Sequence, residues 1–163
     1  MPQVFDCSVD TELLAGMRSA KMAIAKGELV VIPTDTLYGI ACDAFSPKAV
    51  ETLLAAKGRD RQTPPPVLIA NAQTLQALAT EVPQVANTLA EKFWPGALTM
   101  ILRAQPSLQW DLGETRGTVA LRVPDHKIAL ALLEETGPLA VSSANLTGKP
   151  AATTGTGAQE YLG

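Results

Sequence analysis

Hydrophobic positions along the chain change their spacing several times, and each spacing predicts a different kind of element. Between residues 11 and 26, apolar side chains recur every three or four positions, at Leu13, Met17, Ala20 and Ile24. This period is typical of an amphipathic helix. We expect Asp10 to cap this helix and Gly27 to follow its end.

Residues 29–32 form an unbroken apolar run, Leu-Val-Val-Ile. A run of this kind, rich in β-branched side chains, predicts a buried strand. Pro33 cannot donate to a central ladder, so the strand should end there and lead into a polar loop. This loop runs from Thr34 to Gly39 and carries two hydroxyls, a carboxylate and a phenol.

Ser46 and Pro47 predict a helix start, with a capping hydroxyl followed by proline at the first helical position. Gly58 should end this helix, which places Lys57 and Arg59 on either side of its terminus. Residues 103–117 are predicted to form a long loop, and a last helix is expected near Ala158. Further helices are predicted at 73–79, at 83–93 and after Pro124, with strands at 67–69, 97–102, 118–123 and 139–141.

Strands that alternate with helices favour an α/β layer fold. The strands at 97–102 and 118–123 are joined by an irregular loop rather than by a helix, which favours a mixed sheet over a parallel one. At 163 residues, the chain is predicted to be one domain, 1–163, with a core of its own.

The composition agrees with a compact globular protein. Hydrophobic residues make up 47% of the chain, charged residues 18%, and the mean hydropathy is +0.14, which argues against disorder. No apolar run approaches the roughly 20 residues of a membrane helix, and no signal-peptide pattern precedes the first helix. We therefore expect a cytoplasmic protein that does not contact a membrane.

The net charge of −3 limits the classes of partner. Proteins that cover nucleic acid broadly are usually basic, so extensive binding to a phosphate backbone is not expected. A local basic pocket is still compatible with this charge, and residues 57–61, Lys-Gly-Arg-Asp-Arg, are its obvious candidate. Cys7 and Cys42 match neither a metal-binding cluster nor a disulfide framework.

Four polar clusters each follow the end of a predicted strand or helix. They are the 34–36 loop, the cations of 57–61, Arg122 on the polar side of its strand, and residues 142–145, Ser-Ser-Ala-Asn. The hydroxyls alone could cap local backbone, and the cations alone could be solvated charges at a helix C-terminus. Together they favour one shared pocket for an anionic ligand, because α/β folds place ligand contacts at strand ends.

Five segments make the sequence recognisable. They are 33–39 (P-T-D-T-L-Y-G), 56–59 (A-K-G-R), 94–99 (W-P-G-A-L-T), 118–126 (T-V-A-L-R-V-P-D-H) and 143–150 (S-A-N-L-T-G-K-P). In this order they resemble the YrdC-type threonylcarbamoyl-AMP synthase family, and the chain is identified as an actinobacterial-like member. The resemblance implies a twisted, open, mixed sheet flanked by helices, with a concave and positively charged groove.

The resemblance also implies a reaction. L-threonine, bicarbonate and ATP, with Mg²⁺ accompanying the ATP, would give threonylcarbamoyl-AMP and pyrophosphate. The product would feed proteins that transfer the threonylcarbamoyl group to an adenosine of certain tRNAs, and RNA itself is a possible partner. Since charge grows on phosphate oxygens, fixed cations and magnesium should supply most of the catalysis.

The family's site residues can be carried over to matching positions. Lys57 and Arg59 are implied as catalytic residues. ATP would be bound by Lys57, Arg59, Thr118, Ser143 and Asn145, and threonine by Thr34, Arg122 and Val141. No residue of the chain is expected to ligate a metal ion.

Three departures from the family pattern stand out. Ala70 occupies the position of a histidine that the family often has near the substrate, and Ala151 replaces a frequent serine. Relatives also continue beyond the equivalent of Gly163 with residues that help to close the site. We therefore expect a shortened C-terminal end, which bears on the activity of this polypeptide.

Two other functions are compatible with the same sequence. One is a non-catalytic RNA-binding or regulatory module that kept the fold without the chemistry. The other is a carbamoyl-transfer enzyme that acts on a different acceptor. Turnover of ATP and the choice of amine separate these from the synthase.

Overall fold

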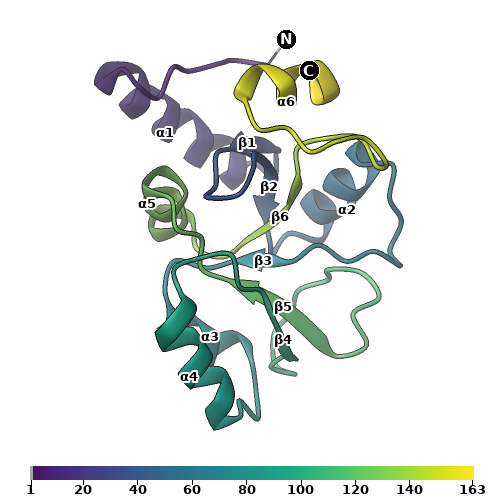
Figure 1. Cartoon of the computed structure of the whole chain (residues 1–163). Helices are drawn as coiled ribbons and strands as arrows, with labels where there is room; N and C mark the ends of the chain where they lie inside the picture. Colours follow the sequence, from purple (N-terminus) through teal and green to yellow (C-terminus); the bar gives the residue numbers. More distant parts are fainter. Residues whose placement is uncertain (1) are drawn as a thin grey trace.

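Within residues 2–163, which the computed structural model describes, six strands form one mixed sheet flanked by six helices (Figure 1). The strands are β1 (Val30–Ile32), β2 (Gly39–Asp43), β3 (Val67–Leu68), β4 (Met100–Arg103), β5 (Thr118–Arg122) and β6 (Leu139–Ser143). The helices are α1 (Asp10–Ala25), α2 (Pro47–Ala56), α3 (Ala72–Leu78), α4 (Gln84–Phe93), α5 (Lys127–Thr136) and α6 (Gly155–Leu162).

The strands lie in the order β1-β2-β6-β3-β5-β4. Only β3 and β5 pair in parallel; the other neighbours are antiparallel. The predicted mixed α/β sheet is therefore confirmed. The irregular loop between β4 and β5 joins an antiparallel pair, as expected of a connection that contains no helix.

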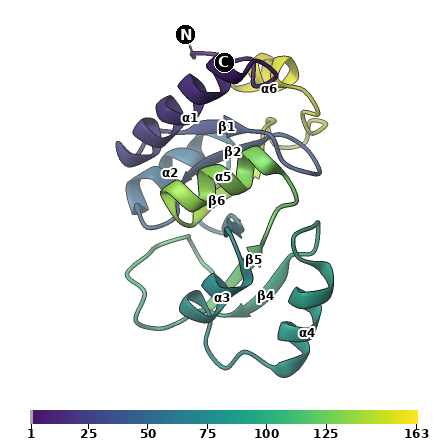
Figure 2. The same ribbon diagram turned by 90° about the vertical axis from the view of Figure 1, so that its left-hand side faces the viewer.

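The helices cover the two faces of the sheet unequally (Figures 1 and 2). Helices α1 and α5 pack on one face, with Ile24 and Leu132 in their core. On the other face, α2, α3 and α4 share a larger core that includes Leu53, Leu75 and Leu121.

Part of the first face stays open where β4 and β5 extend beyond α1 and α5. Thr118, Ala120 and Arg122 alternate with the buried Val119 and Leu121, so they lie on this open face. Ile101 is the cross-strand partner of Ala120 and is 70% exposed. The predicted division of the 118–123 strand into an apolar side and a side with Arg122 is confirmed.

Two features of the first third of the chain differ from the sequence-based predictions. Strand β2 had no counterpart among the predicted elements, although it lies inside the sheet between β1 and β6. The predicted buried strand at 29–32 is instead an edge strand, with Val31 42% exposed. The unbroken apolar run predicted burial of the whole strand. In the structure only Ile32 of β1 is buried, and β2 occupies the interior position in the sheet.

Smaller differences concern helix starts. Asp10 is the first residue of α1 rather than its cap; Val9 holds the cap position and makes no side-chain hydrogen bond there. Ser46, by contrast, caps α2 as predicted, because its Oγ accepts a hydrogen bond from the Ala49 N–H at 3.2 Å.

In residues 2–163, no helix has the length and apolar character needed to cross a membrane.

Leu53 gives a direct test of the larger core, because its side chain has no exposed surface. Leu53→Ala should lower the free energy of unfolding by about 2–5 kcal/mol, since it removes buried apolar contacts and leaves a cavity. Leu14→Ala, at a position of α1 that is 63% exposed, should change it by less than about 0.5 kcal/mol. Urea denaturation measures both variants, and equal losses would contradict this core.

Candidate active site

A pocket of about 290 Å³ opens on the face that carries Arg122. Its walls come from the loop between β1 and β2, the turn after α2, and the ends of β3, β5 and β6. It is lined by Thr34, Thr36, Leu37, Gly39, Arg59, Pro66, Leu68, Arg122, Val141, Ser142 and Ser143. Five of the eight predicted site residues are therefore brought together by the fold: Thr34, Arg59, Arg122, Val141 and Ser143.

The end of α2 directs two cations to different places. Gly58 has a φ of +62°, and the N–H groups of Gly58 and Arg59 bond the carbonyls of Ala55 and Leu54. This pair of bonds is a Schellman motif, which ends a helix at a left-handed residue, usually glycine. The chain reverses at Gly58, so Lys57 points into the protein while Arg59 reaches the pocket wall.

Lys57 is only 1% exposed. Its ammonium donates to the backbone carbonyls of Ser143 and Asn145 and, at 2.8 Å, to Asn145 Oδ1. Burial, and secondarily the charge of Arg59, lowers the pKa of Lys57 to about 8. The alternative of a solvated lysine at the helix end is therefore wrong. Lys57 instead holds the loop that follows β6.

Arg59 is the cation that faces the pocket. Its Nη1 donates to Ser142 Oγ at 3.2 Å and its Nε to Thr147 Oγ1 at 3.3 Å. Both acceptors are neutral hydroxyls, and among residues 2–163 neither Lys57 nor Arg59 forms an ion pair. Arg59 thus presents positive charge and spare N–H donors to any ligand in the pocket.

Arg61, the third cation of this segment, lies away from the pocket. Its guanidinium forms two hydrogen bonds of 2.9 Å with Asp111 and a longer contact with Glu114. Arg61 and its partners are solvent-exposed. For Arg61, the interpretation as an ordinary surface cation is therefore correct.

The loop between β1 and β2 forms a compact turn. Thr34 Oγ1 accepts from the N–H groups of Thr36 and Leu37 and donates to the Leu37 carbonyl at 2.6 Å. The alternative that these hydroxyls cap local backbone is thus confirmed for Thr34. Thr34 nevertheless lines the pocket, so the same geometry presents it to a ligand.

Arg122 is held from two sides. Its Nη2 donates to Asp35 Oδ1 at 2.8 Å and to Thr36 Oγ1 at 3.3 Å. Its Nη1 reaches the other oxygen of Asp35 and, at 3.3 Å, the Gly96 carbonyl. The side chains of Arg122 and Asp35 are 9% and 15% exposed, so this is a largely buried ion pair.

The other predicted residues lie behind the pocket or beside it. Asn145 is buried and supports Lys57 without lining the pocket. Thr118 lies at the far end of β5, about 13 Å along the strand from Arg122, where its hydroxyl donates to the Thr115 carbonyl at 2.7 Å. A ligand would have to extend along the open face to reach it.

Gly39 makes room for a pocket-lining side chain of β6. A Cβ at Gly39 would lie 2.6 Å from Val141 Cγ1, so glycine at this position leaves room for the Val141 side chain. The segment after β6 returns to the same region, where the Tyr38 N–H bonds the Ala152 carbonyl at 2.9 Å.

Ala70, one of the departures from the family pattern, packs against the core of α1 and α5.

Three contributors to the site were not among the eight predicted site residues. Asp35 pairs with Arg122; Thr147 accepts from Arg59 and donates to the Lys57 carbonyl at 2.8 Å; Gly96 bonds Arg122 through its carbonyl. Each lies inside one of the five recognised segments. Membership in a recognised segment was therefore the sequence signal available for these three residues, although it did not indicate which contacts they make.

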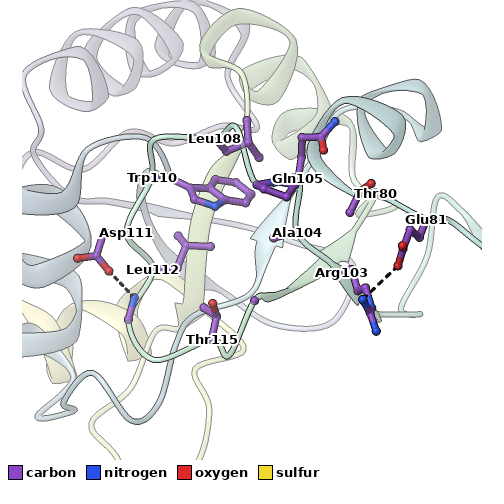
Figure 3. A pocket seen from close by; sticks show the side chains of 13 residues that line it. Thr80, Glu81, Arg103, Ala104, Gln105, Leu108, Trp110, Asp111, Leu112 and Thr115 are labelled. Carbon is purple, nitrogen blue, oxygen red and sulfur yellow. Dashed lines mark hydrogen bonds and ion pairs between the residues drawn. The ribbon is translucent and has the colours of Figure 1, made fainter.

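A larger cavity of about 500 Å³ lies elsewhere (Figure 3). It sits within the loop that joins β4 to β5, where Trp110, Leu108 and Leu112 lie along one side and the Arg103–Glu81 ion pair lies at another. None of the eight predicted site residues lines it. The smaller pocket is therefore the one that predicted site residues line.

Known proteins resemble this chain over most of its length. A protein of Mycobacterium leprae named as a threonylcarbamoyl-AMP synthase is 49% identical over all 163 residues, which cover 74% of that protein. The threonylcarbamoyl-AMP synthase of Bacillus subtilis is 43% identical over 136 residues, which correspond to 82% of this chain and 39% of that enzyme.

Solved structures share the fold. Sua5 of Pyrococcus abyssi, crystallised with L-threonine, superposes with a TM-score of 0.85 at 39% identity, covering 89% of this chain and 43% of Sua5. YciO of Escherichia coli gives a TM-score of 0.74 at 28% identity, over 83% of this chain and 66% of YciO. The family profile described as "Telomere recombination" matches residues 22–163. The chain belongs to the Sua5/YciO/YrdC family.

Proposed function

We propose that this protein is a threonylcarbamoyl-AMP synthase, which forms threonylcarbamoyl-AMP and pyrophosphate from L-threonine, bicarbonate and ATP. The observation that carries the proposal is the junction of Lys57 with Ser143 and Asn145 and of Arg59 with Ser142, beside a pocket that Thr34 lines. The relatives named as threonylcarbamoyl-AMP synthases and the threonine complex of Pyrococcus Sua5 support it.

The nucleotide is assigned to the side of the pocket formed by Arg59 and Ser143. Arg59 has no carboxylate partner in the described chain, and its neighbours are hydroxyls that a phosphate can also contact. Lys57 supplies a second positive charge from the protein interior behind the pocket. Its ammonium also fixes the backbone of Ser143 and Asn145. An extended ATP could continue along the open face toward Thr118, whose assignment remains a prediction.

L-threonine is assigned to the other side, between Thr34, Val141 and Arg122. These residues combine a hydroxyl, an apolar wall and a cation, as a hydroxylated amino acid with a methyl group requires. The Pyrococcus relative was crystallised with this same amino acid. The two substrates would then meet above β6.

The chemistry needs positioning and charge more than a nucleophilic side chain. The threonine amine combines with bicarbonate, with loss of water, to give a carbamate. A carbamate oxygen attacks the α-phosphorus of ATP, the bond to the bridging oxygen breaks, and pyrophosphate leaves with that electron pair. Arg59 and Lys57 would stabilise the charge that develops on the phosphate oxygens, and Mg²⁺ would enter as part of the ATP substrate.

The wider setting follows from the same proposal. The product would pass to proteins that modify tRNA, and the enzyme would work in the cytoplasm. RNA is a further candidate partner, through direct binding. The chain spans about three quarters of its mycobacterial relatives and less than half of Pyrococcus Sua5. The activity of the whole protein is therefore part of the proposal.

Arg59→Ala should lower threonine- and bicarbonate-dependent release of pyrophosphate from ATP by about 10²–10³-fold, the usual loss when one preorganised charge-stabilising donor is removed. It should stay folded, because Arg59 is only half-buried and its side-chain acceptors are neutral hydroxyls rather than a carboxylate. Lys57→Ala should lose turnover and also stability, since buried carbonyls lose their donor. A coupled pyrophosphate assay and thermal denaturation measure the two effects.

Arg18→Ala is the control for these variants, because Arg18 is an exposed arginine on α1, away from the pocket. It should turn over ATP at the rate of the unaltered protein. Salt-sensitive tRNA binding without any pyrophosphate release would instead favour the non-catalytic RNA-binding module. Equal turnover with amines other than threonine would favour transfer to another acceptor.

The affinity for MgATP should fall as the pH rises through about 8. The lowered pKa of Lys57 means that its ammonium loses a proton there, and the neutral amine attracts phosphate less. Because the charge of Arg59 contributes to the lowering, Arg59→Gln should move the inflection to higher pH. Isothermal titration calorimetry with MgATP alone, between pH 7 and about 10, measures the inflection. An affinity independent of pH in this range would contradict a role for the Lys57 charge.

A further inference from the structure

The loop between β1 and β2 reaches across the sheet to Arg122. We refer to its residues 33–37 as the strap. Three strands, β2, β6 and β3, lie between β1 and β5 in the sheet, a separation of about 19 Å at the usual strand spacing of about 4.8 Å. Side chains of β6 and β3 line the pocket together with the strap, so the strap and Arg122 meet across the pocket.

Few side-chain hydrogen bonds join the strap to the rest of the described chain. The hydrogen bonds of Thr34 stay inside the strap. Within residues 2–163, the side-chain hydrogen bonds that leave the strap all end on Arg122, two from Asp35 and one from Thr36. Arg122 also donates to the Gly96 carbonyl, so the residue that binds the strap is itself held by a contact outside the strap.

The Asp35–Arg122 pair has the features of a strong contact. It is largely buried, and both carboxylate oxygens accept from the guanidinium, at 2.8 and 3.5 Å. Charge-assisted, two-pronged pairs of this kind fix geometry as well as contributing energy. While the pair is formed, Nη1 and Nη2 of Arg122 are both occupied.

We infer that Asp35 is a positioning residue for the amino-acid substrate. By pairing with Arg122, it holds the strap closed over the pocket, which sets Thr34 toward the ligand and keeps the guanidinium against the pocket wall. The inference rests on the proposed function, since it assigns Thr34 and Arg122 to threonine. Asp35 does not take part in the chemical step, because both of its oxygens accept from Arg122 and it does not line the pocket.

Asp35→Asn removes the charge and keeps the shape of the side chain. Two consequences are expected. The amides of Thr36 and Leu37, which bond Thr34 Oγ1, should exchange with solvent at least about ten-fold faster, since the strap opens more often. The KM for threonine should rise by about 10- to 100-fold, the loss typical of one charged hydrogen-bond partner, while the KM for ATP changes less than about three-fold.

Thr36→Val is the second variant, because Thr36 is exposed and its substitution leaves the ion pair intact. It should shift strap exchange and the KM for threonine in the same direction by a smaller factor. Glu135→Gln is the matched control. It removes a different ion pair, Lys21–Glu135, which joins α1 to α5 far from the strap, and should leave strap exchange and both KM values unchanged.

The outcomes separate this inference from the proposed function. If Asp35→Asn speeds amide exchange in the strap but the unaltered protein shows no turnover, the role of Asp35 in holding the strap stands and the proposed synthase activity is overturned. Turnover with unchanged strap exchange and unchanged KM for threonine in both variants would overturn the inference. A fall in kcat alone, with strap exchange unchanged, would also overturn it, since Asp35 would then act in the reaction itself.

Discussion

The buried ammonium of Lys57 is the constraint on which the rest of the site depends. A charge removed from water must be compensated by hydrogen bonds or by an opposite charge. Lys57 is compensated by oxygens of Ser143 and Asn145, residues that lie 86 and 88 positions further along the chain. The loop after β6 cannot move away from α2 without leaving this charge unpaired. The Lys57 side chain therefore links the two halves of the pocket, together with the hydrogen bonds of Arg59 and Thr147.

This attachment determines what the neighbouring cations can do. Lys57, Arg59 and Arg61 are close in sequence, yet they occupy the interior, the pocket wall and the outer surface. The left-handed turn at Gly58 separates the first two, and the pairing with Asp111 removes the third. Arg59 is thus the pocket-lining arginine that has no carboxylate partner in the described chain, because Arg122 is paired with Asp35.

The sequence could predict features that are set by neighbouring residues. Ser46 and Gly58 bound α2 through capping that involves only a few positions, so both limits were predicted correctly. Strand β2 escaped prediction because Gly39–Asp43 is rich in small residues and shows no alternation. It is a strand because β1 and β6 pair with both of its edges. The Asp35–Arg122 pair and the burial of Lys57 likewise depend on contacts across 86 or more residues.

The net charge of the chain is a poor guide to the charge inside the pocket for the same reason. The protein carries a formal charge of −3, but acidic groups on its surface are screened by solvent and salt within about 10 Å. What a ligand meets is the set of charges inside the pocket that lack a partner. There the lining residues include two arginines and no carboxylate, and one of the two is neutralised from outside by Asp35. An acidic protein can therefore offer an anion a local cation, provided that the fold keeps its carboxylates out of the pocket wall.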